Sequence, residues 1–229
     1  MASLVPGYKI LEKKTGQWYG ITKIEPEDKR MIITIGRQHG SNGHDIAREL
    51  ARQLDYQCYD KEIVDHAAEN SGFSKEIFDS YDEKKVSAYV VPTPHYMGMG
   101  EGFRLNMQVA SAQFDAIRML ADRGNGIFVG RCADYVLRNR KDLVRVFIMA
   151  DKHFRVKTLM ERKGIDAEQA KKLMRQVDKD RSSYYKYYTD QLWGEAENYE
   201  LCIDSSVIGV EGAVEVIKAF IAAKEKTQA

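Results

Sequence analysis

The sequence predicts an α/β fold with three layers, in which helices cover both faces of a five-stranded parallel sheet. From Met31 onward, short strand-like segments alternate with helical patterns. The strand-like segments are nearly all apolar, which is typical of parallel strands buried on both faces. A glycine-containing loop follows the first strand and precedes the first helix, an order typical of phosphate-binding enzymes.

The individual elements follow from composition and periodicity. Strands are expected at 31–35, 56–60, 126–130, 143–149 and 199–204. The helical periodicity of the apolar residues predicts helices at 44–54, 61–70, 103–122, 131–138, 151–162, 166–188 and 210–224. Asp166 and Gln169 form an N-terminal capping signature for one of them. A chain of 229 residues suits one such domain, which we expect at 31–225.

Residues 1–30 precede this domain. Apolar and polar residues alternate on either side of Lys14-Thr15-Gly16, which predicts a β-hairpin. Such a hairpin can pack against the core or against a second subunit. The sequence therefore leaves a homodimer open.

Two regions interrupt the alternation of strands and helices. Residues 61–122 contain helical patterns and the long irregular segment VSAYVVPTPHYMGMGEG, and a loop of that length usually has a function. Residues 151–194 form a helix pair rich in basic residues and tyrosines. On a sheet that begins with a phosphate loop, this layout indicates a small kinase. The region 61–122 would be its acceptor-binding insertion and 151–194 its helical lid.

Composition excludes several other classes of protein. The net charge is +1, with 35 basic and 34 acidic side chains, which argues against a dedicated nucleic-acid binder. No apolar run approaches the roughly 20 residues of a membrane span, and the N-terminus lacks the apolar stretch of a signal peptide. The three cysteines and five histidines show no metal-ligand spacing, so we expect no protein-bound metal cluster. These features favour a cytoplasmic location.

Three blocks of the sequence carry a resemblance to a known family. They read ITIGRQHGSNGHDIARELARQLDYQCYDKEIV, IFVGRCADYVLR and YELCIDSSVIGVEGAVEVI. In this order they resemble the cytidylate kinase-like family of P-loop nucleoside monophosphate kinases, across about residues 31–222. The resemblance implies the P-loop kinase fold and transfer of a phosphoryl group from ATP to CMP or a related monophosphate, with Mg²⁺. We expect the acceptor to be CMP or dCMP. A nucleotide-sensing protein that binds without turnover is the alternative.

The alternative arises because the phosphate loop lacks the usual lysine. Counted from the strand end, Gly43 takes the lysine position; aligned on the last glycine, His44 takes it and Asp45 takes the Ser/Thr position. Backbone N–H groups and the helix dipole can bind phosphate without a charged side chain. We expect arginines from elsewhere to supply the missing cation. The expected ATP-binding residues are Gly36, Arg37, Gly40, Ser41, Asn42, Gly43, His44 and Asp45.

Some of these residues have a second interpretation. The Ser41 hydroxyl can bind phosphate or magnesium, or it can cap the following helix. Asp60 lies at a strand end, where open sheets present ligand-binding residues, so Asp60 and Lys61 can contact the acceptor nucleotide. Asp60 can instead be a helix cap.

Arginines in two further places are candidates for phosphate contacts. The resemblance implies that Arg131 binds the acceptor's monophosphate, with Asp134 as a secondary contact to the base or to magnesium; the other possibility is that Arg131 faces solvent. In the lid, Arg155 and Arg162 share one polar helix face, which we expect to be exposed until the lid closes. The expected catalytic lid residues are Arg155, Arg162, Arg175 and Arg181. The tyrosines at 184–188 are interpreted as helix packing rather than RNA stacking.

Overall fold

The computed structural model describes residues 8–12, 18–23, 31–84 and 101–228. The chain divides into two compact units, residues 1–30 and 31–229. In the first unit, β1 (Tyr8–Glu12) and β2 (Trp18–Lys23) pair antiparallel, with Ile10 opposite Ile21. The expected turn at 14–16 lies outside the described residues.

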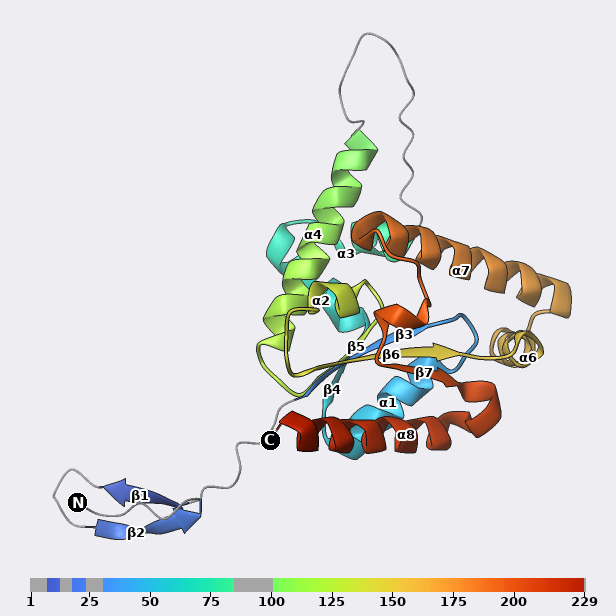
Figure 1. Cartoon of the computed structure of the whole chain (residues 1–229). Helices are drawn as coiled ribbons and strands as arrows, with labels where there is room; N and C mark the ends of the chain where they lie inside the picture. The colour runs from blue at the N-terminus through green and yellow to red at the C-terminus, as the bar shows by residue number, and fades with distance from the viewer. Residues whose placement is uncertain (1–7, 13–17, 24–30, 85–100, 229) are drawn as a thin grey trace. The chain divides into compact units, whose positions relative to one another are not determined.

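The second unit is built on a five-stranded parallel sheet, as predicted (Figure 1). Its strands are β3 (Ile32–Arg37), β4 (Gln57–Tyr59), β5 (Gly126–Val129), β6 (Leu143–Met149) and β7 (Leu201–Asp204). They lie in the order β4-β5-β3-β6-β7. The first strand in the chain order of this unit is therefore central, and the loop that follows it lies in the middle of the sheet's carboxyl edge.

Successive side chains of the strands pack into two separate hydrophobic cores, one on each face of the sheet. Ile33 and Ile35 point to the face covered by α1 (Gly43–Leu54) and α8 (Ser205–Gln228). Ile32 points to the opposite face. That face is covered by α2 (Lys61–Ser71), α3 (Lys75–Tyr81), α4 (Glu101–Ala121) and α5 (Ala133–Val136). Burial on both faces explains why these strands are almost entirely apolar.

Two further helices, α6 (Lys152–Lys163) and α7 (Ala167–Thr189), lie beyond the end of β6, where α6 is seen end-on and α7 runs across the view (Figure 1). They share a small apolar core. The predicted cap of α7 is confirmed, because Asp166 and Gln169 form a complete capping box. Tyr184 and Tyr185 are buried against Cys132, so the tyrosine cluster packs between elements as expected.

Some boundaries differ from the prediction. Helix α3 was not expected, because its seven residues are too few for a clear periodicity. Helix α8 begins at Ser205 rather than at residue 210, with a non-helical Gly209 inside it. The helix expected at 131–138 is shortened to α5, because residues 130–132 form a turn with positive φ angles. A short 3₁₀ helix, Ala196–Asn198, precedes β7.

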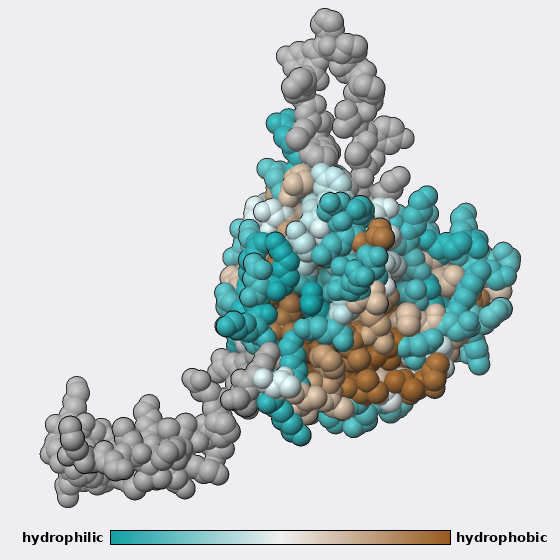
Figure 2. Space-filling model, in the orientation of Figure 1, coloured by the Kyte–Doolittle hydropathy of each residue, from teal (hydrophilic) through white to brown (hydrophobic). Residues whose placement is uncertain are grey.

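Hydrophilic side chains cover much of the face shown in Figure 2, and apolar ones gather in the region of α8. Val207 is 77% exposed, and Ile208 beside it is also exposed. Over the described part of the chain, none of the helices combines the length and apolar character needed to span a membrane.

Candidate active site

The loop between β3 and α1 is held by the ends of neighbouring elements. The N–H of Gln38 donates to the Ile148 carbonyl at 2.9 Å, and the Ser205 hydroxyl donates to the Ser41 carbonyl at 2.7 Å. The Ser41 side chain is fully buried, and its hydroxyl donates to the carbonyls of Gln38 and Ile148. The N-cap of α1 is Asn42, so the capping role for Ser41 is wrong. The Ser41 hydroxyl faces the backbone rather than open space.

Two glycines of the loop are required by packing against arginines. Gly40 has a φ of +84°, and a Cβ there would lie 2.8 Å from the carbonyl oxygen of Arg155. A Cβ on Gly43 would lie 2.5 Å from the Cβ of Arg37. The loop can therefore follow this path only with glycine at both positions. At its end, the first N–H groups of α1 have no partner within the helix and can bind an anion.

A cavity of about 330 Å³ opens over this loop, and we call it the loop cavity. Four of the predicted nucleotide-binding residues line it: Gly40, Asn42, Gly43 and His44. Arg162 and Lys163 of α6 and Arg181 of α7 line it as well. The other four predicted residues, Gly36, Arg37, Ser41 and Asp45, are not among the residues that line it.

A second cavity of about 340 Å³ lies at the ends of β4 and β5, and we call it the charged cavity. Most of the residues around it are ionisable. They are Arg37, His44, Asp60, Lys61, Val64, Asp82, Glu83, Lys84, Arg131, Val177, Asp180 and Arg181. His44 and Arg181 line both cavities, so the two spaces adjoin at these side chains.

Arg131 is buried at the floor of the charged cavity, so its solvent-facing interpretation is wrong. Its guanidinium binds both carboxylate oxygens of Asp82, at 2.8 and 2.6 Å, and donates to Asp60 at 2.9 Å and to the Val129 carbonyl at 3.1 Å. Burial alone would lower the pKa of Arg131, but the surrounding carboxylates outweigh it and raise that pKa. The guanidinium is therefore permanently charged and already bound by protein carboxylates.

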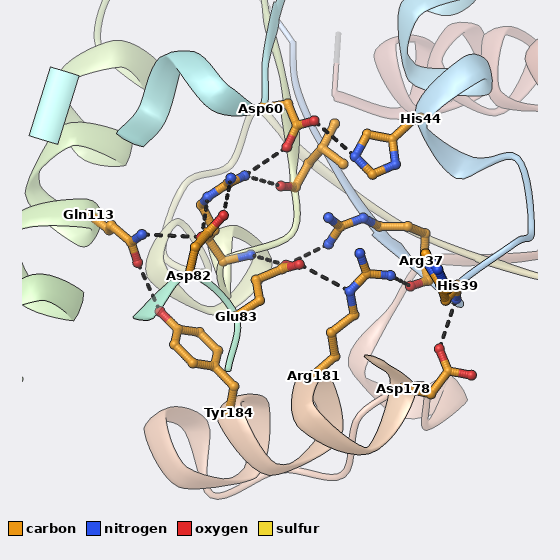
Figure 3. A network of polar contacts seen from close by, with 12 residues as sticks. Arg37, His39, His44, Asp60, Asp82, Glu83, Gln113, Asp178, Arg181 and Tyr184 are labelled. Carbon is orange, nitrogen blue, oxygen red and sulfur yellow. Dashed lines mark hydrogen bonds and ion pairs between the residues drawn. The ribbon is translucent and has the colours of Figure 1, made fainter. Parts of the chain in front are cut away.

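Glu83 occupies a comparable position between two other arginines (Figure 3). Its carboxylate accepts hydrogen bonds from Arg37 at 2.5 Å, from Arg181 at 3.0 Å and from the backbone N–H of Arg131 at 2.9 Å. Burial would raise the pKa of Glu83, but Arg37 and Arg181 hold it well below its ordinary value. Sequence reasoning missed Asp82 and Glu83. The sequence feature that could have indicated them is an acidic pair just before the irregular segment. Such pairs are too common to identify a binding site.

His44 connects the loop to the end of β4. Its Nε2 lies 2.9 Å from Oδ2 of Asp60, whose other oxygen contacts Arg131. Asp60 is at the N-cap position of α2, but its side chain makes no capping hydrogen bond. Asp60 is therefore the N-cap residue by position, as one interpretation expected, but its carboxylate does not cap the helix and lines the charged cavity. Lys61, the next residue, is exposed and also lines that cavity.

Arg155 differs most from its prediction. The expected exposed face of α6 is turned toward the loop, so Arg155 and Thr158 are buried. The Nε of Arg155 donates to the His39 carbonyl at 2.9 Å, and its NH2 group is ion-paired with Asp178 of α7. Arg155 therefore joins the loop, α6 and α7, and lines neither of the two cavities.

The other three lid arginines have separate surroundings. Arg162 is half exposed and contacts Asn42 at 2.7 Å and Asp45 at the start of α1. Arg181 contacts Glu83 and the Arg37 carbonyl. Arg175 is exposed and is not among the residues that line either cavity, so the structure does not bring it to the site.

His39, in the loop itself, is not a source of positive charge. Burial, reinforced by Arg181 and other nearby cations, lowers its pKa to about 4. Its backbone N–H donates to Asp178 at 2.8 Å, and its Nε2 is buried without a partner among the described residues. His39 is therefore neutral at neutral pH.

Asp134 is not among the residues that line the loop cavity or the charged cavity. It is buried, and its carboxylate accepts a hydrogen bond from the Tyr185 hydroxyl at 2.6 Å. Burial raises its pKa. It lines a small space of about 20 Å³ together with Gly36 and with Arg37, Glu83, Arg131 and Arg181 of the charged cavity. The contact of Asp134 with the acceptor or magnesium stays a prediction.

The sheet order, the glycine loop after its central strand and the adjoining cavities at its carboxyl edge are those of the P-loop kinase fold. The fold is similar to that of shikimate kinase from Bacteroides thetaiotaomicron, with a TM-score of 0.50 and 12% identity over 84% of this chain and 98% of that one. It is also similar to an uncharacterized protein from Eubacterium ventriosum, with a TM-score of 0.64 and 27% identity over 84% and 99% of the two chains.

The chain belongs to the cytidylate kinase-like family, whose profile matches residues 32–207. Curated relatives include the cytidylate kinase of Pyrococcus horikoshii, 24% identical over 86% of this chain and 90% of the relative. Another is the cytidylate kinase of Methanococcus vannielii, 27% identical over 83% and 99% of the two chains. Family and fold together support a nucleoside monophosphate kinase.

Proposed function

We propose that this protein transfers a phosphoryl group from ATP to CMP or dCMP, forming the diphosphate. The observation that carries the proposal is the meeting of the two cavities at His44 and Arg181. A donor phosphate bound over the loop and an acceptor bound in the charged cavity would face one another across these two side chains. Direct transfer between bound substrates requires such an arrangement.

The loop would hold the phosphates of ATP through backbone N–H groups at the start of α1. Arg162 is the lid arginine that reaches this helix end, where it contacts Asn42 and Asp45. Arg181 lines both cavities and would contact the transferring group. Phosphoryl transfer spreads negative charge over the transferring oxygens, so fixed cations on both sides would stabilise the transition state.

His44 would take the place of the usual lysine. It lines both cavities and is oriented by its contact with Asp60. Of the two sequence alignments of the loop, the one that puts His44 at the lysine position is favoured by this location. Gly43, the other candidate, packs against the side chain of Arg37.

A magnesium ion fits the chemistry of the donors near this border. Mg²⁺ prefers oxygen ligands and is usually held by one or two carboxylates together with substrate phosphates. Asp60 lines the charged cavity beside His44, whereas Asp45 is paired with Arg162 and lines neither cavity. Asp60 would therefore hold the ion together with substrate phosphates, and the bound ion would neutralise part of the phosphate charge.

A nucleotide-sensing role without turnover is the second candidate, and one observation favours it. The arginines of the charged cavity are already paired with Asp60, Asp82 and Glu83. If these ion pairs persist, the cavity would not accept a monophosphate.

A coupled assay for ADP release distinguishes the two roles, with each nucleoside monophosphate offered in turn alongside ATP and Mg²⁺. We expect turnover with CMP or dCMP. Measured ATP binding without turnover of any monophosphate would favour the sensor. The absence of both binding and turnover would contradict both roles.

A further inference from the structure

The ion pairs of Glu83 have the geometry of a bound anion. Three donors that come from different elements converge on this carboxylate: Arg37 at the end of β3, Arg181 in α7 and the backbone N–H of Arg131. The side chains of Arg37, Arg181 and Glu83 are 4%, 11% and 12% exposed. Two guanidinium groups and a backbone N–H around one anion form the usual set of donors for a phosphate group.

The backbone beside Glu83 is shaped for this contact. Gly130, Arg131 and Cys132 all have positive φ angles, of 74°, 55° and 55°. This turn directs the Arg131 N–H at Glu83. A Cβ on Gly130 would lie 1.9 Å from Oε1 of Glu83, so the anion approaches the turn more closely than any other residue type would permit. The turn therefore forms one wall of a small anion site.

The cluster is electrically balanced while Glu83 is in place. The positive charges of Arg37, Arg131 and Arg181 face the carboxylates of Asp60, Asp82 and Glu83. If all three carboxylates stayed in place, a phosphate that entered the cluster would lie at contact distance from them. Such contacts between like charges are costly. One carboxylate must leave for a phosphate to be bound by the arginines.

Glu83, rather than Asp82, lies where donors from three different elements converge. Asp82 binds Arg131 through both oxygens and also accepts a hydrogen bond from Gln113, which is itself held by Tyr184 (Figure 3). Glu83 bridges two arginines instead of forming a two-pronged pair with one. In addition, the Nε of Arg37 is buried without a partner among the described residues. A phosphate monoester, with three terminal oxygens rather than two, could accept one more hydrogen bond there than the carboxylate does.

We propose that the Glu83 carboxylate occupies the site that binds the acceptor's phosphate, and that the phosphate displaces it. Glu83 then selects for acceptors with a phosphate monoester, because a neutral acceptor cannot replace the charge that the arginines would lose. This inference rests on the proposed function for the identity of the acceptor. The anion site itself can be tested without turnover.

The first test measures binding of inorganic phosphate and of CMP to the full chain by titration calorimetry, for the unchanged protein and for Glu83→Gln. The glutamine keeps the size of the side chain and removes its charge, so phosphate should bind roughly 10- to 100-fold more tightly to the variant. Glu76→Gln is the control, because Glu76 is an exposed carboxylate on the nearby helix α3. Phosphate that binds in the loop cavity would contribute equally to the binding measured for all three proteins. Equal or weaker binding by Glu83→Gln, or the same gain in Glu76→Gln, would overturn the proposal.

A second measurement uses the unchanged protein, so it does not depend on the variant folding. Amide hydrogen exchange should become faster at residues 82–84 when CMP or phosphate is added, because Glu83 is released. Unaltered or slower exchange there, with ligand demonstrably bound, would overturn the proposal. If no monophosphate is turned over but Glu83→Gln gains phosphate affinity, the proposed function fails and the anion site stands. If CMP is turned over but Glu83→Gln gains no phosphate affinity, the anion site fails and the proposed function stands.

Discussion

The Nε2 of His44 lies 2.9 Å from Oδ2 of Asp60. This contact joins the first turn of α1 to the end of β4, and so joins the loop cavity to the charged cavity. Burial alone would raise the pKa of Asp60, but the hydrogen bond from His44 and the charge of Arg131 outweigh it and lower that pKa. Asp60 therefore stays a carboxylate through the neutral range and orients the imidazole.

We expect His44→Ala to lower kcat/KM for the proposed transfer by roughly 10² to 10³, the usual effect of losing one preorganised donor to the transition state. His44→Arg should retain most of the activity, because arginine supplies a cation and can still pair with Asp60. The measurement is the coupled assay at saturating and at limiting ATP. Full turnover by His44→Ala would show that His44 does not replace the missing lysine.

The pairing of His44 with Asp60 can be tested separately with a double-mutant cycle. The combined effect of His44→Ala and Asp60→Asn on kcat/KM should be smaller than the product of the single effects, because the two side chains are in contact. Independent effects would mean that Asp60 acts through Arg131 rather than through His44.

Arg155→Ala should destabilise the fold, because Arg155 is buried and ion-paired with Asp178. Removing one partner of a buried pair costs roughly 3 kcal/mol or somewhat more, and the partial exposure of Asp178 reduces that figure. The control is Arg175→Ala, in the same helix pair, where the exposed side chain should change the free energy of unfolding by less than about 0.5 kcal/mol. Urea unfolding measures both. Equal stability of the two variants would contradict the assigned role of Arg155.

Gly40→Ala should weaken nucleotide binding and lower stability. Gly40 has a φ of +84°, and the added Cβ would lie 2.8 Å from the Arg155 carbonyl oxygen, so the loop must move. Gly164→Ala is a matched control, since Gly164 has a φ of +63° with nothing within 4 Å of the added Cβ. It should cost only the roughly 1–2 kcal/mol of the left-handed backbone and leave nucleotide affinity unchanged. Comparable losses of affinity in both variants would argue against a steric effect at the loop.

Stability should fall in mild acid through His39. Its folded-state pKa of about 4 is below the ordinary value near 6.5, so between these pH values the unfolded chain binds a proton that the folded chain does not. Above about pH 6.5 His39 does not change the free energy of unfolding. By pH 5 it lowers the free energy of unfolding by about 2 kcal/mol, and by less where solvent screens the ring. Urea unfolding at pH 7 and pH 5 should show a smaller decrease for His39→Gln than for the unchanged protein. The same decrease in both would exclude His39 as the cause.

The sequence by itself determined the architecture of the domain. Strand order along the chain, the glycine loop and the capped helix α7 depend on short-range patterns of apolar and turn-forming residues, which report local structure directly. The sequence also predicts that Asp60 lies at the ligand-binding edge of the sheet. The reason is that the carboxyl ends of parallel strands meet at one edge. Those features needed no knowledge of distant contacts.

Only the tertiary structure decided which charged residues form the site. Arg155 and Arg162 share a helix face, as their spacing indicates, yet that face is turned toward the loop, where Arg155 is buried and Arg162 is half exposed. Glu83 lies 46 residues from Arg37 and 98 from Arg181 in the chain, and no local pattern links them. Periodicity shows which side chains share a face of one helix. What that face meets depends on how the helices pack on the sheet, and ion pairs between distant elements arise only from that packing.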